Sequence, residues 1–157
     1  MMAKRKRDDF RNEFTARVYL AAAEERLASL EFLYARGLYT LALYVSGVAV
    51  ESIFRAYRCK IDPMFDARHN LYDLARSAKF AQIVPAGRTD EYDKALVDVA
   101  VRWSNNHRYR SDAAVRSFLR RAELNRKVKG DFLKENARRA IDAAFFLVNL
   151  GLLKWKN

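Results

Sequence analysis

Hydrophobic positions along the first part of the chain repeat with the period of a helix. Within residues 10–36, apolar side chains recur three and four positions apart, at Ala16, Leu20, Ala23, Leu27, Leu30 and Tyr34. This spacing places one apolar stripe along a helix that starts at Phe10 and ends at Arg36. Gly37 follows directly and predicts the helix end, because glycine adopts positive φ there at little cost.

Residues 38–61 predict a second helix whose first half is apolar around its whole circumference. No residue between positions 38 and 50 is charged, a pattern typical of a helix that other helices surround. Glu51 and Arg55 then stand four residues apart, the spacing of an ion pair on one helix face. We expect this carboxylate to have a structural role.

Two shorter helices are expected in the middle of the chain. Asp62-Pro63 interrupts the second helix, and a short helix then runs from Arg68 to near Phe80, with His69 in a capping or packing role. Thr89 is expected to cap a fourth helix. The buried stripe of this helix is predicted to be Tyr92, Leu96, Val99 and Trp103.

The last third of the chain predicts two more helices. Ser111 is expected to cap a fifth helix, and its inward side chains are predicted to be Val115, Phe118, Leu119 and Ala122. Asp131 is expected to cap the last helix, whose apolar positions extend to Leu152. No strand-like alternation or internal repeat is present. The chain therefore predicts an all-α fold, an up-down bundle of four to five main helices plus one short helix. Residues 10–157 would form a single domain behind a flexible basic tail, residues 1–9.

The charge of the chain indicates a class of partner. The chain of 157 residues carries a net charge of +11, and such a surface attracts polyanions, RNA or DNA above all. A hydrophobic content of 51% excludes a disordered chain. The alternative interpretation is a helical domain whose basic charge serves solubility alone.

Cysteine content and hydropathy indicate the compartment. The single cysteine, Cys59, excludes an internal disulfide and a cysteine-based metal site. The first residues carry charge but no apolar core of a secretory signal, and no apolar run is long enough to span a bilayer. We therefore expect a cytoplasmic protein with no membrane partner, no metal site and no cofactor.

Chemistry-bearing side chains concentrate in residues 102–109, where the fourth helical pattern ends. Arg102 and His107 stand five residues apart, so on a continuous helix they would diverge by about 140°. They converge only if the helix ends at residues 104–106, whose short polar side chains compete for backbone groups. A helix end at this point would bring a guanidinium beside an imidazole that titrates near neutral pH.

Such a pair suits cleavage of RNA through the ribose 2′-hydroxyl. His107 would act as acid or base and Arg102 would stabilise the charged phosphorane, without a metal. Arg108 and Arg110 would hold phosphates, Tyr109 would stack on a base, and Asn106 adds a polar RNA contact. The alternative leaves Arg102 paired only with Asp98 and His107 as an ordinary loop residue.

The residues of these helices and of the 102–109 segment also carry a family resemblance. Residues 21–42, the Gly47–Ser52 stretch and the His69-Asn70-Leu71 stretch resemble the HEPN family (higher eukaryotes and prokaryotes nucleotide-binding domains). Residues 102–109 resemble its Arg-x4-His-x-Tyr motif. The likeness covers most of residues 15–153.

The resemblance implies a fold, an activity and partners. HEPN domains are helical bundles that commonly form homodimers, and active members are metal-independent ribonucleases, often toxins or antiviral effectors, with Arg102 and His107 here as the catalytic pair. A bacterial subset pairs with a nucleotidyltransferase antitoxin that modifies the motif tyrosine, here Tyr109. Trp103 departs from the polar residue usual after the arginine. Trp103 with Arg108-Tyr109 also fits members without the nuclease pair, so a non-catalytic module that binds RNA, nucleotide or a nucleotidyltransferase partner is the alternative.

Overall fold

The computed structural model describes residues 15–65 and 69–155. These residues form helices and no strand, which confirms the predicted all-α class. The α-helices are α2 (Ala16–Ala35), α3 (Tyr39–Ile61), α4 (Leu71–Ser77), α5 (Thr89–Arg102), α6 (Asp112–Arg121) and α7 (Phe132–Trp155). Short 3₁₀ helices lie between them, η1 (Phe80–Ile83), η2 (Ala86–Arg88) and η3 (Asn105–Tyr109). The predicted basic tail, residues 1–9, lies outside the described residues.

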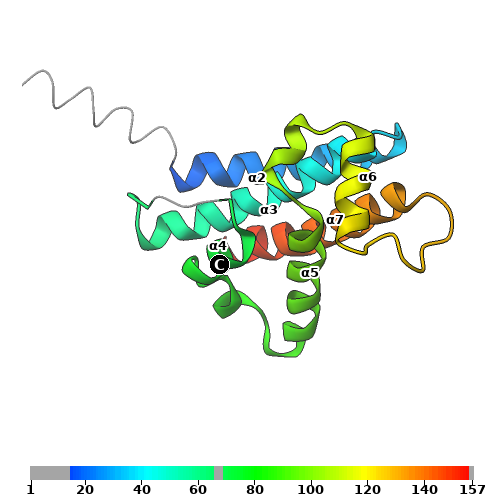
Figure 1. Ribbon diagram of the computed structural model, residues 1–157. Helices are drawn as coiled ribbons and strands as arrows, with labels where there is room; N and C mark the ends of the chain where they lie inside the picture. The colour runs from blue at the N-terminus through cyan, green and yellow to red at the C-terminus, as the bar shows by residue number, and fades with distance from the viewer. Residues whose placement is uncertain (1–14, 66–68, 156–157) are drawn as a thin grey trace, which may run out of the picture.

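Helix α3 is the centre of the packing. It contacts α2 and α7 along its length, and α7 also packs against α5 (Figure 1). Phe54, Ile53 and Leu147 belong to the larger core cluster. A smaller cluster joins α3 to α6 and α7 and contains Leu43, Val115, Leu119, Leu133, Ala137 and Ala140. The first turn of α3 is less enclosed than its apolar sequence predicts, because Leu38 and Leu41 are exposed.

The α2–α3 connection follows the predicted glycine stop. Gly37 has a φ of 73°, and its N–H donates to the Tyr34 carbonyl while that of Leu38 donates to the Leu33 carbonyl. These two bonds define a Schellman motif. At the other end of α2 the Thr15 hydroxyl accepts from the Val18 N–H, so the described helix begins later than the predicted Phe10. Residues 10–14 lie outside the described part of the chain.

Several predicted helix ends are confirmed and others are wrong. Ser111 caps α6 and Asp131 accepts from the first N–H groups of α7, as expected. Thr89 is already helical and caps nothing, because η2 runs directly into α5 and Arg88 takes the cap position. Ala122 is the exposed C-cap of α6 rather than an inward residue. The short third helix is capped by Asn70 and ends at Ser77, before Phe80.

No helix in the described segments is both long and apolar enough to cross a membrane.

Candidate functional site

The fourth helix ends where the polar residues predict it to end. Helix α5 stops at Arg102, and Trp103 and Ser104 have extended backbone. The Ser104 hydroxyl then accepts from the Asn106 N–H and starts η3. The chain therefore turns away from the α5 axis between Arg102 and His107.

Trp103 anchors this turn on α3. Its indole N–H donates to the Tyr44 carbonyl at 3.0 Å, and its ring lies directly over Gly47. A Cβ atom on Gly47 would come within 2.0 Å of the Trp103 ring, so only glycine allows this approach. The predicted burial of Trp103 is confirmed.

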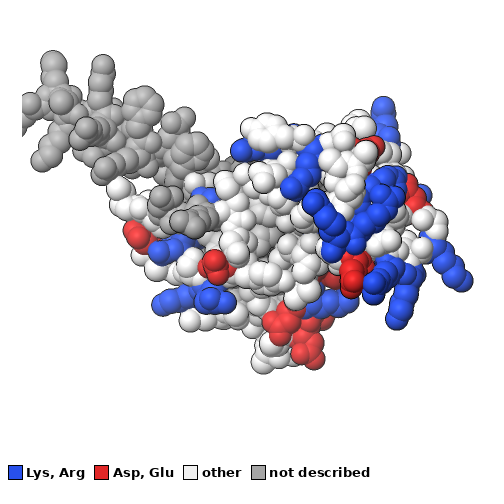
Figure 2. Space-filling model, in the orientation of Figure 1, with Lys and Arg blue, Asp and Glu red and all other residues white. Residues whose placement is uncertain are grey.

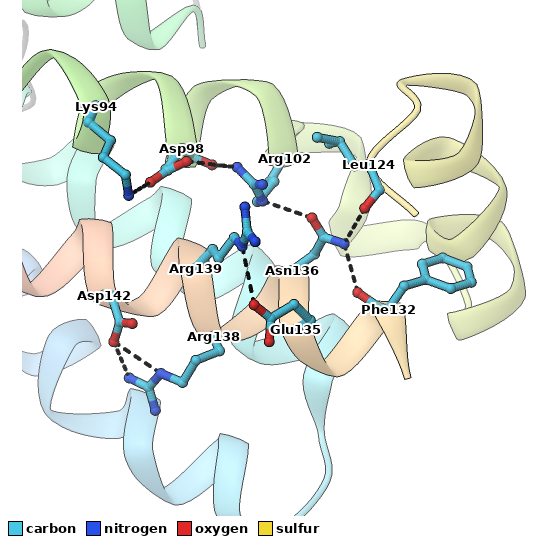
Figure 3. A network of polar contacts seen from close by, with 10 residues as sticks. All are labelled: Lys94, Asp98, Arg102, Leu124, Phe132, Glu135, Asn136, Arg138, Arg139 and Asp142. Atoms are coloured by element: carbon cyan, nitrogen blue, oxygen red, sulfur yellow. Dashed lines mark hydrogen bonds and ion pairs between the residues drawn. The ribbon is translucent and has the colours of Figure 1, made fainter. Parts of the chain in front are cut away.

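The Arg102 guanidinium is buried between α5 and α7. The residue is 4% exposed. Its Nη1 donates to the Asp98 carboxylate at 3.1 Å and to the Asp98 carbonyl at 3.0 Å, and its Nε donates to Oδ1 of Asn136 at 2.8 Å (Figure 3). Burial lowers the pKa of Arg102, while the Asp98 charge acts in the opposite direction. The ion pair between Arg102 and Asp98, which the sequence analysis gave as an alternative, is therefore present.

Asn136 extends this contact to the segment after α6. Its amide nitrogen donates to the Leu124 carbonyl at 2.9 Å and to the Phe132 carbonyl at 2.7 Å (Figure 3). The residue is 1% exposed, so each of these bonds lies out of bulk water, where losing a partner is costly. Arg102 thus connects α5, through Asn136 of α7, to the α6–α7 connection.

His107 is held in one tautomer by two neighbours. Its Nε2 lies 2.8 Å from the Arg102 carbonyl, which only accepts, and its Nδ1 lies 3.1 Å from Nη1 of Arg110, which only donates. The ring is therefore neutral, with its proton on Nε2. Its edge-to-face contact with Phe118 and its 2% exposure complete the enclosure. Burial lowers the pKa of His107; the Arg102 carbonyl opposes this shift and the Arg110 charge adds to it.

Within this chain, the side chains of Arg102 and His107 do not converge on one site as expected. The Arg102 guanidinium binds Asp98 and Asn136, whereas the His107 ring binds Arg110 and the main-chain oxygen of Arg102. The helix break was predicted, but the two side chains enter different parts of the interior because each finds a buried partner there.

The remaining predicted site residues lie at the surface. Tyr109 is 79% exposed, and the Arg108 guanidinium sits 4.6 Å from its ring centre. Arg110 is half-buried, over the Phe118 ring. Asn106 is exposed, and its backbone N–H is used by Ser104. Arg108, Tyr109 and Arg110 are thus placed to meet a ligand from solvent.

A pocket of about 300 Å³ opens beside these residues. Its walls come from the α2–α3 turn and from η3, and they comprise Gly37, Leu38, Thr40, Leu41, Tyr44, His107, Arg108, Arg110 and Asp112. Leucine side chains supply an apolar part and arginines a cationic part, while the Asp112 carboxylate, which accepts from the Thr40 hydroxyl, supplies an acidic part. A few polar groups around an apolar surface are typical of small-ligand pockets.

Several polar contacts were not predicted from the sequence. Asn136 is the partner of Arg102, and its only signal is an amide inside the apolar stripe of the last helix. Glu51 and Arg55 pair as predicted, at 2.8 Å, but the same carboxylate also binds His69 at 2.6 Å. Asn70, rather than His69, caps the short helix. Within the described residues no group of three or more potential metal ligands forms.

Comparison with known proteins adds no relative. No protein-family model, curated protein sequence or solved structure matches this chain.

Proposed function

We propose that this protein is an RNA-binding helical domain whose ligand docks on η3 and the adjacent pocket, with Arg102 and His107 as internal supports. One observation carries the proposal. Arg108, Tyr109 and Arg110 reach solvent together beside a pocket, while Arg102 and His107 are enclosed and bonded to protein groups. The net charge of +11 supports a polyanionic ligand.

The exposed groups have complementary tasks in this proposal. Arg108 and Arg110 pair with phosphates, and the guanidinium fork suits two phosphate oxygens at once. Tyr109 offers a ring face on which an unpaired base stacks, with Arg108 on the same ring adding a cation–π contact. Because the bases of a duplex are already stacked on each other, this platform favours a single strand.

Binding of a labelled single-stranded RNA, measured by fluorescence anisotropy over a range of salt concentrations, tests the proposal. The double variant Arg108→Gln/Arg110→Gln should bind more weakly and lower the slope of log K against log salt by about 1.4, or about 0.7 per lost phosphate contact. The double variant Arg17→Gln/Arg76→Gln, exposed on α2 and α4, removes the same charge elsewhere. Equal losses in the two variants would remove η3 from the binding surface.

A metal-independent HEPN-type ribonuclease, acting as a toxin or defence effector, is the second candidate. It is favoured by the position of His107 on the pocket wall, where Arg110 covers Nδ1. A phosphate that draws Arg110 away would free a neutral imidazole nitrogen to accept a 2′-hydroxyl proton. In this version a second protomer completes the cleft and Arg102 must leave Asp98.

The two candidates differ in turnover. If the domain only binds RNA, the RNA should stay intact during incubation with the protein in EDTA. Cleavage that disappears in a folded His107→Gln variant, with RNA affinity retained, would establish the ribonuclease. The exposed Tyr109 hydroxyl would also be reachable by the nucleotidyltransferase antitoxin that the HEPN resemblance implies.

A further inference from the structure

A second group of cations surrounds the connection between α6 and α7. Figure 2 shows Lys and Arg side chains gathered over α6 and the connection that follows it. We name this group the cationic loop surface, and it comprises Arg120, Arg121, Arg126, Lys127 and Lys129, all exposed. Glu123 is the one carboxylate among residues 120–130, so the local charge is strongly positive.

Most of this charge is not neutralised by the protein itself. Arg126 pairs with Glu123 at 3.0 Å, and Arg120 lies over the Phe132 ring. Arg121, Lys127 and Lys129 form no ion pair within residues 15–65 and 69–155. Side-by-side cations without counter-charges repel one another, so an anionic ligand would relieve a cost present in the free protein.

The connection has a defined backbone conformation. The Glu123 N–H donates to the Arg120 carbonyl and the Leu124 N–H to the Leu119 carbonyl. These bonds form a Schellman motif with Glu123 at a φ of 60°. Leu124 then packs on the smaller core cluster, and Asn136 binds its carbonyl. Lys127, also at a φ of 60°, completes a folded turn that presents the cations.

We propose that the cationic loop surface is a second binding site for RNA phosphates, and that Asn136, held by Arg102, positions it. This inference rests on the proposed RNA binding. The η3 segment leads through Arg110 directly into α6, whose ten residues span about 15 Å. A strand of several nucleotides with a base on Tyr109 would therefore reach the loop with its backbone.

The geometry gives Arg102 a task other than catalysis. Its Nε fixes the Oδ1 side of Asn136, which orients the amide nitrogen toward the Leu124 carbonyl. Arg102 is thus a positioning residue for the cationic loop surface, two contacts away from the Leu124 carbonyl at the start of the loop. An arginine suits this task because its Nε and Nη1 donate in fixed directions to two partners.

A series of charge-neutralising variants, measured with a labelled oligouridylate RNA, tests the site. The variant Arg121→Gln/Lys127→Gln/Lys129→Gln should lower the slope of log K against log salt by about 2. The variant Arg17→Gln/Arg26→Gln/Arg76→Gln removes the same charge from exposed positions on α2 and α4 and should lower it much less. Equal effects of both variants would overturn the inference. RNA binding absent from the wild type would instead overturn the proposed function.

The positioning role has its own variant. Asn136→Asp keeps the size of the side chain and its acceptor for Arg102, but it cannot donate to the Leu124 and Phe132 carbonyls. Residues 122–131 should exchange amide hydrogens faster, and the RNA affinity should fall by at least about threefold. The slope of log K against log salt should move toward that of the triple variant. Wild-type affinity in the presence of faster exchange would show that loop position is irrelevant to binding. If this variant does not fold, the charge-neutralisation series still decides whether the loop binds RNA, and Arg102→Lys, which lacks the fixed pair of donors to Asp98 and Asn136, tests the positioning role by the same amide exchange.

Discussion

At the scale of single residues, His107 shows how burial converts a titratable group into a structural one. Its two nitrogens face an obligate acceptor and an obligate donor, so only the neutral ring satisfies both. Protonation would place an N–H against the Arg110 guanidinium. The sequence predicted an imidazole that titrates near neutral pH, but it could not predict these neighbours, because the contact of Arg110 with the ring depends on the turn of the chain at η3.

Acid should therefore destabilise the fold through His107. The folded pKa of His107 is lowered, so its stabilising contribution is present above the unfolded value near 6.5 and is lost as pH falls below it. The free energy of unfolding in urea should fall less between pH 7.5 and pH 5 for His107→Gln than for the wild type. The glutamine keeps a donor for the Arg102 carbonyl. His69→Gln is the control. Parallel pH profiles for wild type and His107→Gln would contradict the buried neutral ring.

Arg102 illustrates a second limit of sequence reasoning at this scale. The pairing with Asp98 follows from a separation of four residues on one helix, and it was weighed as an alternative. The bond to Asn136 spans 34 residues, and no local pattern indicates it. A polar side chain in the apolar stripe of a helix is the kind of residue that should prompt a search for a distant partner.

At the scale of elements, the contact between α3 and the 103–109 segment depends on Gly47. Alanine would favour the helix by about 1 kcal/mol. A Cβ at 2.0 Å from the Trp103 ring would instead displace a buried indole, and overpacking costs up to about 3 kcal/mol and occasionally more. The clash outweighs the propensity gain.

We therefore expect Gly47→Ala to lose about 2 kcal/mol of unfolding free energy in urea, together with burial of Trp103 as judged by its fluorescence. Gly87→Ala is the matched control, because nothing lies within 4 Å of the added carbon. A Gly47→Ala protein as stable as this control would mean that Trp103 does not rest on α3.

Helix ends were predictable to the extent that they depend on local chemistry. Gly37, Ser111 and Asp131 act through their own backbone and side-chain atoms, and all three were predicted. The prediction that Thr89 caps α5 was wrong, because the 3₁₀ turn at Ala86–Arg88 already supplies the first helical geometry. That turn depends on how residues 80–88 cross from α4 to α5, which no local pattern specifies.

At the scale of the whole molecule, hydrophobic periodicity predicts the all-α class but not the packing. Helix α3 packs against both α2 and α7, but its second half, which carries Glu51 and Arg55, is more buried than its charge-free first turns. The division of the interior into two clusters, with α6 on the smaller one, arises from contacts between distant segments. Helix α6, which carries Arg120 and Arg121 in its last turn, follows η3 directly in the chain.

We expect RNA to bind on η3 and the cationic loop surface while the Arg102 and His107 side chains remain enclosed supports. Titration of a labelled single-stranded RNA with the wild-type protein in EDTA, read as anisotropy and followed by recovery of the RNA, tests it most directly. Binding should weaken steeply with salt, and the RNA should be recovered at full length. Absence of binding at low salt, or fragments whose formation requires His107, would contradict it.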